Sequence, residues 1–149
     1  MDCLCNAGFS NVSVLDISGR ALDSAKRRLG DLAAKVEWFE CDITEFDPPQ
    51  RYALWHDRAV FHFLTEEPDR NKYVNVLRRA LQPGGHLIIA AFALGGPERC
   101  SGLEIVQYDA SRLMTVLGDE FNLLEEASEI HVTPAKKEQK FVYFRLVRK

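Results

Sequence analysis

The stretch from Pro68 to Phe92 constrains the fold of this chain more than any other part of the sequence. A helical pattern that opens at Pro68 stops at Gln82-Pro-Gly-Gly85, because proline cannot extend a helix and glycine permits a turn. The residues that follow, His86 to Phe92, are almost uninterruptedly apolar. A strand of this kind is typical of a parallel sheet covered on both faces, so the stretch predicts an α/β fold.

The rest of the chain alternates between strand and helix patterns, which favours a mostly parallel sheet with helices on both faces. Residues Met1 to Gly8 are typical of the end of a helix, and Gly95 to Gln107 form an irregular stretch. Helices are predicted from a Ser18 cap to Leu29, from Pro68 to Leu81 and from an Asp109 cap to Leu117, and the second of them has an apolar face that includes Tyr73. Further strands are predicted at Asn11–Leu15, Val36–Glu40, Tyr52–His56 (apolar enough to be buried on both faces), Phe121–Val132 and Gln139–Val147.

The last two predicted strands are joined by a turn around Pro134 and are expected to form an antiparallel pair. No internal repeat, low-complexity segment or linker interrupts the 149 residues. We therefore expect one domain over residues 1–149.

The composition narrows the classes of partner and compartment. A net charge of −3 with scattered basic residues gives no basic face for nucleic acid. No apolar run approaches the roughly 18 residues of a membrane span, and residues 1–10 do not resemble a secretion signal. The four cysteines have no zinc-ligand spacing, so we expect no metal and a reducing, cytoplasmic environment.

Three of the predicted strands end in an acid, and ligands of open α/β sheets bind beyond the carboxyl ends of the strands. Asp16 could accept hydrogen bonds from both hydroxyls of a ribose, with Ile17 covering a base, or it could serve only as a helix N-terminal acid. Asp42 could accept from an adenine amino group beside the Ile43 amide, or bond its own backbone in a turn.

The third acid lies in His56-Asp57-Arg58, and His62 follows shortly after. A histidine here could act as a general base, and Asp57 or Arg58 could orient a substrate. The alternative is an ion pair of Asp57 with Arg58 or a helix, and a packed His62. In the later loop, Arg99 and Tyr108 are candidates to line a substrate pocket, unless this is a surface loop that binds nothing.

These motifs together resemble the class I S-adenosylmethionine (SAM)-dependent methyltransferases. The resemblance rests on Leu15-Asp-Ile-Ser18, Cys41-Asp-Ile-Thr44, the Leu81-Gln-Pro-Gly-Gly85 element before a strand, and the terminal strand pair. Trp55 to Leu64 is similar to the family segment that faces the methyl group. The resemblance implies a Rossmann-like methyltransferase fold with a mostly parallel sheet and a C-terminal antiparallel strand pair.

The resemblance also implies roles for individual residues. Asp16 would hold the ribose of SAM and Asp42 its adenine, with Ile17 and Ile43 on the two faces of the ring. The catalytic candidates would be His56, Asp57 and His62. Of these, His56 and Asp57 would lie near the methionine end and His62 toward the acceptor. Arg58 and Phe61 would bind the substrate, and Arg99 and Tyr108 of the later loop are the other two substrate-binding candidates.

The family pattern begins earlier than this sequence does, with a strand and a glycine-rich loop that approaches the methionine part of SAM. We therefore expect that the first strand is absent and the domain is N-terminally truncated. In the family order 3-2-1-4-5-7-6, that loss leaves the Asn11–Leu15 and Tyr52–His56 strands without their shared neighbour, and buried unpaired backbone groups cost about 1–3 kcal/mol each.

Three functions are compatible with these observations. The first is SAM-dependent methyl transfer to a small-molecule acceptor, impaired in a truncated chain. The second is a non-catalytic methyltransferase-like protein that acts through a partner. The third, a nicotinamide-dependent oxidoreductase, would explain Asp16 but neither the Pro-Gly-Gly element nor the terminal strand pair.

Overall fold

The computed structural model describes residues 2–58, 60–133, 136 and 138–149, which form two compact units, residues 1–46 and 47–149. The expectation of one domain over residues 1–149 stays a prediction. None of the helices in these ranges is both long and apolar enough to cross a membrane.

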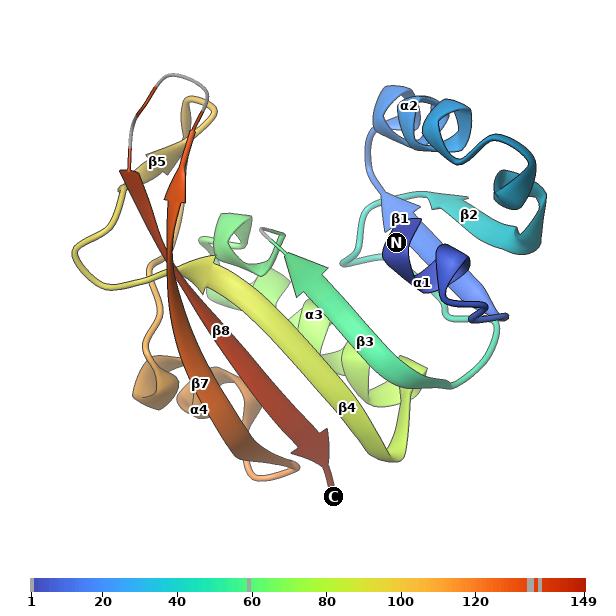
Figure 1. Ribbon diagram of the computed structural model, residues 1–149. Helices are drawn as coiled ribbons and strands as arrows, with labels where there is room; N and C mark the ends of the chain where they lie inside the picture. Colours follow the sequence, from blue (N-terminus) through green and yellow to red (C-terminus); the bar gives the residue numbers. More distant parts are fainter. Residues whose placement is uncertain (1, 59, 134–135, 137) are drawn as a thin grey trace. The chain divides into compact units, whose positions relative to one another are not determined.

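The first unit is built on two parallel strands, β1 (Val12–Asp16) and β2 (Val36–Glu40), in register from Val12 with Val36 (Figure 1). The short helix α1 (Asp2–Asn6) precedes them, and α2 (Gly19–Leu29) followed by the 3-10 helix η1 (Gly30–Lys35) connects them. The predicted cap is confirmed, because the Ser18 side chain accepts from the Ala21 amide. The buried apolar residues of this unit are Leu22, Leu29, Val36, Ile43 and Phe46.

The second unit is built on a four-stranded sheet in the order β3-β4-β8-β7. Figure 1 shows helices α3 (Glu67–Ala80) and α4 (Ala110–Leu117) on one face of this sheet. Strands β3 and β4 are parallel, and β8 is antiparallel to both β4 and β7, which confirms the predicted C-terminal strand pair. The turn predicted around Pro134 lies outside the described residues. The bounds are β3 Tyr52–Arg58, β4 Leu81–Phe92, β7 Phe121–Val132 and β8 Glu138–Arg148.

Among the described residues, the two sheets match two parts of the expected strand order. The pair β2-β1 corresponds to the 3-2 part of that order, and β3-β4-β8-β7 corresponds to 4-5-7-6. Strand β3 is therefore an edge strand of its sheet. The prediction that this strand is buried on both faces was wrong: Leu54, His56 and Arg58 are exposed, and Asp57 on the opposite face is buried.

Helix α3 (Glu67–Ala80) packs its predicted apolar face, and α4 (Ala110–Leu117) begins after the Asp109 cap as expected. The 3-10 turn η2 (Phe61–Phe63) follows β3, and a small hairpin of β5 (Arg99–Cys100) and β6 (Leu103–Glu104) lies within the stretch that was predicted to be irregular.

The Pro-Gly-Gly element forms a bulge at the start of β4. Tyr52 pairs with Leu81, but Leu54 pairs with His86. A step of two residues along β3 is therefore matched by a step of five residues along β4. Gly84 has a φ of +74°, which glycine adopts without strain. The element therefore follows the end of α3, absorbs the extra residues and brings His86 to Ala90 into register with β3.

Candidate functional site

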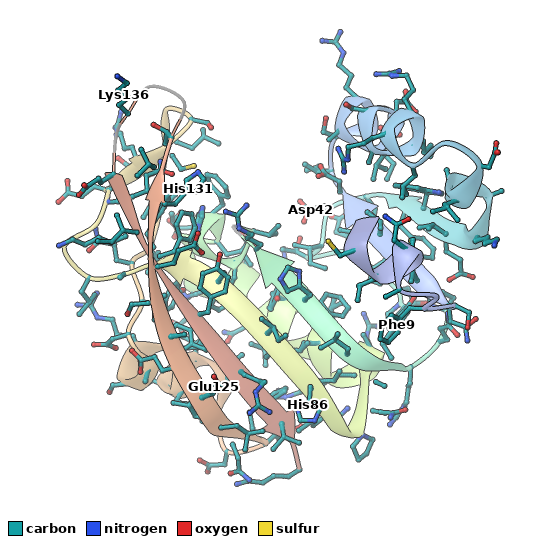
Figure 2. The ribbon with its side chains drawn as sticks, in the orientation of Figure 1. Phe9, Asp42, His86, Glu125, His131 and Lys136 are labelled. Atoms are coloured by element: carbon teal, nitrogen blue, oxygen red, sulfur yellow. The ribbon has the colours of Figure 1, made fainter. Side chains whose placement is uncertain are left out.

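Two acids lie at the same edge of the first unit's sheet. Asp16 ends β1, and Asp42 follows the end of β2 by two residues. Because the strands are parallel and paired from end to end, their carboxyl ends coincide, and the Cys41 amide donates to the Asp16 carbonyl at 3.3 Å. Figure 2 labels Asp42 at this edge.

Each of these carboxylates has one oxygen engaged by its own loop. Asp16 Oδ1 accepts from the Ser18 amide at 2.8 Å, and Asp42 Oδ1 accepts from the Thr44 amide and hydroxyl, both at 2.8 Å. In the described chain, Oδ2 of each acid has no hydrogen-bond partner. The loops thus fix two acceptor oxygens without satisfying them, which is what a polar ligand with hydroxyl or amino donors requires.

The two isoleucines beside these acids differ in exposure. Ile17 is 70% exposed, whereas Ile43 is only 7% exposed and belongs to the core of the first unit. Ile17 therefore offers an apolar surface next to Asp16. The prediction that both residues flank an adenine stays a prediction.

At the end of β3, Asp57 belongs to a buried hydrogen-bond network. Its Oδ2 accepts from the Tyr73 hydroxyl at 2.8 Å, and its carboxylate also accepts from the Val60 and Phe61 amides. Trp55 Nε1 in turn donates to the Tyr73 hydroxyl at 3.2 Å. Burial raises the pKa of Asp57, and these hydrogen bonds oppose that rise. Asp57 thus fixes the turn η2 by hydrogen bonds. In the part of the chain that the structure describes, it forms no ion pair with Arg58, which was the alternative left open by the sequence.

His56 and Arg58 point to the other face of β3, since neighbouring side chains of a strand alternate. Both are exposed. Partial desolvation lowers the pKa of His56, and the positive charge of Arg58 lowers it further. The imidazole is therefore neutral at pH 7 and able to accept a proton, while Asp57 is directed away from it into the network below α3.

His62 lies in an aromatic cluster rather than on a surface. Its side chain is fully buried, its ring stacks on Phe92 at 4.9 Å, and neither ring nitrogen has a partner in the described chain. Burial lowers its pKa to about 4. Phe61 and Tyr108 meet in the same region, with ring centroids 5.1 Å apart, so the structure brings these two predicted substrate residues together.

Arg99 lies apart from that cluster, in the β5–β6 hairpin, and pairs with Glu104 at 3.3 Å. It borders a surface hollow of about 730 Å³ whose lining includes Ile105, Val106 and Arg112. The adjoining Gln107 holds the loop before the hairpin: Gly95 N donates to its side-chain oxygen, and its side-chain nitrogen donates to the carbonyls of Gly96 and Pro97.

Three residues of these arrangements were missed by sequence reasoning. The sequence places Tyr73 only on the apolar face of a helix and Gln107 only at the end of an irregular stretch. It places Tyr143, whose hydroxyl accepts from Arg58 Nε at 3.4 Å, only in a strand. In each, the one available signal is a polar group within an apolar or small-residue segment. That signal does not identify a partner that is distant in the sequence.

The sequence profile of the methyltransferase domain family matches residues 2–85, which is more than half of the chain. The chain belongs to this family. The matched region contains both acids of the first unit, the end of β3, η2 and the Pro-Gly-Gly bulge. The family profile therefore covers the motifs on which the resemblance rests, except for the terminal strand pair.

The methyltransferase-domain chain is also similar to individual proteins. Nodulation protein S of Rhizobium tropici is 28% identical over 80 residues, which is 54% of this chain and 33% of the relative. The N-methyltransferase NodS of Bradyrhizobium japonicum WM9, solved with S-adenosyl-L-homocysteine, superposes with a TM-score of 0.74 at 18% identity over 93% of this chain and 66% of that one. A SAM-dependent methyltransferase of Methanosarcina mazei gives a TM-score of 0.76 at 14% identity over 97% and 84%.

These structures show that the chain has the Rossmann-like methyltransferase fold. The chain spans one third of the curated relative's length and just under two thirds of the B. japonicum structure.

Proposed function

We propose that this methyltransferase-domain protein transfers the methyl group of SAM to a small-molecule acceptor. The observation that carries the proposal is the pair of acids at the end of β1 and β2, each with one oxygen held by its own loop and the other unengaged. When bound, SAM supplies a methyl group activated by its sulfonium. The protein then has to position the acceptor and, for a protonated acceptor, remove a proton.

The adenosine part of SAM fits the first unit. Asp16 would accept from the ribose hydroxyls, because a carboxylate at a strand end is acceptor-only and fixed in place. Asp42 would accept from the adenine amino group, and the exposed face of Ile17 would contact the ring. The presence of S-adenosyl-L-homocysteine in the NodS structure of the same fold supports this choice of cofactor.

In the second unit, His56 is the proposed base. Its imidazole is exposed and is held neutral by desolvation and by Arg58, which leaves a ring nitrogen able to accept a proton from the acceptor. Asp57 and His62 act as positioning residues in this proposal, because their side chains are buried. Phe61, Tyr108 and Arg99 remain proposed substrate contacts.

Isothermal titration calorimetry with SAM tests the cofactor assignment. We expect saturable binding to the wild-type chain. Asp16→Ala and Asp42→Ala should each weaken that binding by about tenfold or more, because a hydrogen bond to a charged group contributes about 1.5–3 kcal/mol. The matched control is Asp31→Ala, which removes an exposed acid of the same unit from η1.

Asp31→Ala should bind SAM as the wild type does. An equal loss in the control would mean that the effect is one of net charge. No heat at millimolar SAM would contradict methyl transfer by this chain and favour the non-catalytic alternative, in which the protein acts through a partner. Where SAM binds, formation of S-adenosyl-L-homocysteine with amine, thiol, phenol and carboxylate acceptors identifies the chemistry of the acceptor.

A further inference from the structure

A row of four residues crosses the four-stranded sheet on the face opposite α3 and α4. In register, Arg58 on β3 lies beside Ala90 on β4, Ala90 beside Tyr143 on β8, and Tyr143 beside Ala127 on β7. The small side chain of Ala90 lets Arg58 reach across β4. The Arg58 Nε donates a long hydrogen bond of 3.4 Å to the Tyr143 hydroxyl, and the guanidinium lies 5.5 Å from the ring centre of Phe141.

The hydrogen-bonding capacity of this pair is largely unused. In the described part of the chain, the Arg58 guanidinium has only the contacts with Tyr143 and Phe141, so both of its terminal nitrogens keep their protons for other acceptors. The Tyr143 hydroxyl accepts from Arg58 and donates to no described residue. Arg58 and Tyr143, which are 85 positions apart in the sequence, thus place two hydrogen-bond donors side by side with no acceptor bound to both.

The acids on the same face do not neutralise Arg58. Glu125 on β7 lies in the next row and pairs with Arg145 at 3.0 Å. Glu129, opposite Phe141, forms no ion pair with Arg58 among the described residues. Figure 2 shows Glu125 and His131 toward opposite ends of β7. By register, Ala127 of the Arg58 row lies between them on that strand.

The surroundings form an apolar wall on one side. Phe141 is 5% exposed and packs with Ala90 and Phe92, and Cys100 and Ile105 pack against this cluster. An anion held at Arg58 would therefore be partly shielded from water, which strengthens a charge-assisted hydrogen bond. His56 points to the same face of β3, two residues before Arg58.

We propose that the methyl acceptor carries an oxyanion, either a carboxylate or a phosphate ester, which binds to the terminal nitrogens of Arg58 and the hydroxyl of Tyr143. That the bound molecule is a methyl acceptor rests on the proposed function. The anion site itself is formed by strands β3, β4 and β8 alone. Anchoring at Arg58 would place the rest of the acceptor beside His56, the proposed base.

The test is an NMR titration of the full chain labelled with 15N-arginine. The Arg58 Nε–Hε signal is assigned by its loss in Arg58→Met, and three probes of one shape are added: benzoate, phenyl phosphate and benzamide. We expect benzoate or phenyl phosphate to shift that signal with a dissociation constant of about 10 mM or lower, and benzamide to bind at least about tenfold more weakly. The anion that binds more tightly identifies the acceptor class.

Three variants distinguish anion binding by Arg58 and Tyr143 from an effect of the net positive charge on this face of the sheet. Tyr143→Phe should weaken anion binding by about three- to tenfold, and Arg58→Lys should retain part of it. The matched control is Arg145→Met, which removes an equal charge from the next row, where Glu125 already satisfies it, and which should bind the anion within about twofold of wild type.

Equal binding of benzamide, absence of binding by both anions, or an equal loss in Arg145→Met would overturn the proposal. SAM binding is measured on the same samples. Failure of SAM to bind while benzoate still binds at Arg58 would contradict the proposed function and leave the anion site in place.

Discussion

The hydroxyl of Tyr73 on α3 donates a 2.8 Å hydrogen bond to Oδ2 of Asp57 at the end of β3, and the same carboxylate accepts from the amides of Val60 and Phe61. This relationship links the helix, the strand end and the turn η2 through one buried acid.

The first prediction concerns that bond. Tyr73→Phe should lower the free energy of unfolding by about 2 kcal/mol at pH 7, since hydrogen bonds to charged groups contribute about 1.5–3 kcal/mol. Burial raises the pKa of Asp57 and the Tyr73 bond lowers it, so the variant should raise that pKa further. An acid with a raised folded pKa contributes stability below its ordinary pKa and loses it as pH rises through the folded pKa.

The stability difference between Tyr73→Phe and wild type should therefore be larger at pH 7 than near pH 4 in urea unfolding. Trp55→Phe serves as the control, because it removes a donor to the Tyr73 hydroxyl and leaves the bond to Asp57. That variant should lose a similar amount at both pH values. A cost of Tyr73→Phe that does not change with pH would contradict the role of this bond.

The second prediction follows from the buried imidazole of His62. Its pKa is lowered from 6.5 to about 4 by burial, so the unfolded chain binds more protons than the folded one between these values. Stability from His62 is thus present above pH 6.5 and is lost as pH falls toward about 4, by roughly 2–3 kcal/mol. His62→Phe should remove this term, because phenylalanine keeps the stack on Phe92 without titrating.

The measurement is the difference in unfolding free energy between wild type and His62→Phe across that range of pH, which isolates His62 from Asp57 and His56. As the pH is lowered, the free energy of unfolding of His62→Phe should rise relative to that of the wild type. Phe92→Leu is the control, and it should destabilise by a similar amount throughout, since it alters packing only. A difference for His62→Phe that stays flat with pH would show that the imidazole is hydrated in the folded state.

Several parts of this fold could be predicted because their signals are local. Val36–Glu40 and Phe121–Val132 were predicted with the observed bounds, and Ser18 and Asp109 cap helices as expected. Capping depends on three or four consecutive residues, and strand alternation on about five. Such patterns are complete within a short segment of sequence.

The candidate site could be predicted only in part, because it depends on register. Asp16 ends one of two adjacent parallel strands, Asp42 follows the other by two residues, and both lie at one edge of the sheet as the strand order predicts. The contact of Arg58 with Tyr143 requires the pairing of β3 with β4 and of β4 with β8, which no local pattern gives. For the same reason the sequence identifies Tyr73 only as part of an apolar helix face and does not predict the bond of its hydroxyl to Asp57.

The third prediction tests the Pro-Gly-Gly bulge with two adjacent glycines. A Cβ at Gly85 would lie 2.8 Å from the Gln82 carbonyl oxygen and 3.0 Å from the Leu81 side chain. Gly85→Ala should therefore cost about 2–3 kcal/mol of unfolding free energy, as expected for overpacking a buried position. Gly84→Ala meets no atom within 4 Å but keeps a φ of +74°, and should cost about 1 kcal/mol. Urea unfolding measures both, and equal stability of Gly85→Ala and wild type would contradict the close packing.

The fourth prediction concerns Gln107, whose side chain accepts from Gly95 and donates to the carbonyls of Gly96 and Pro97. Gln107→Leu should free this loop and cost about 1–2 kcal/mol, because three backbone groups lose their partner while the side-chain volume is kept. Hydrogen–deuterium exchange should rise at Gly95 far more than on β4. The control is Glu98→Gln in the same segment, which removes an exposed charge and should leave exchange unchanged. Unchanged protection of Gly95 in Gln107→Leu would mean that the loop is held by its backbone bonds, such as the Gly96 amide to the Ala93 carbonyl, rather than by Gln107.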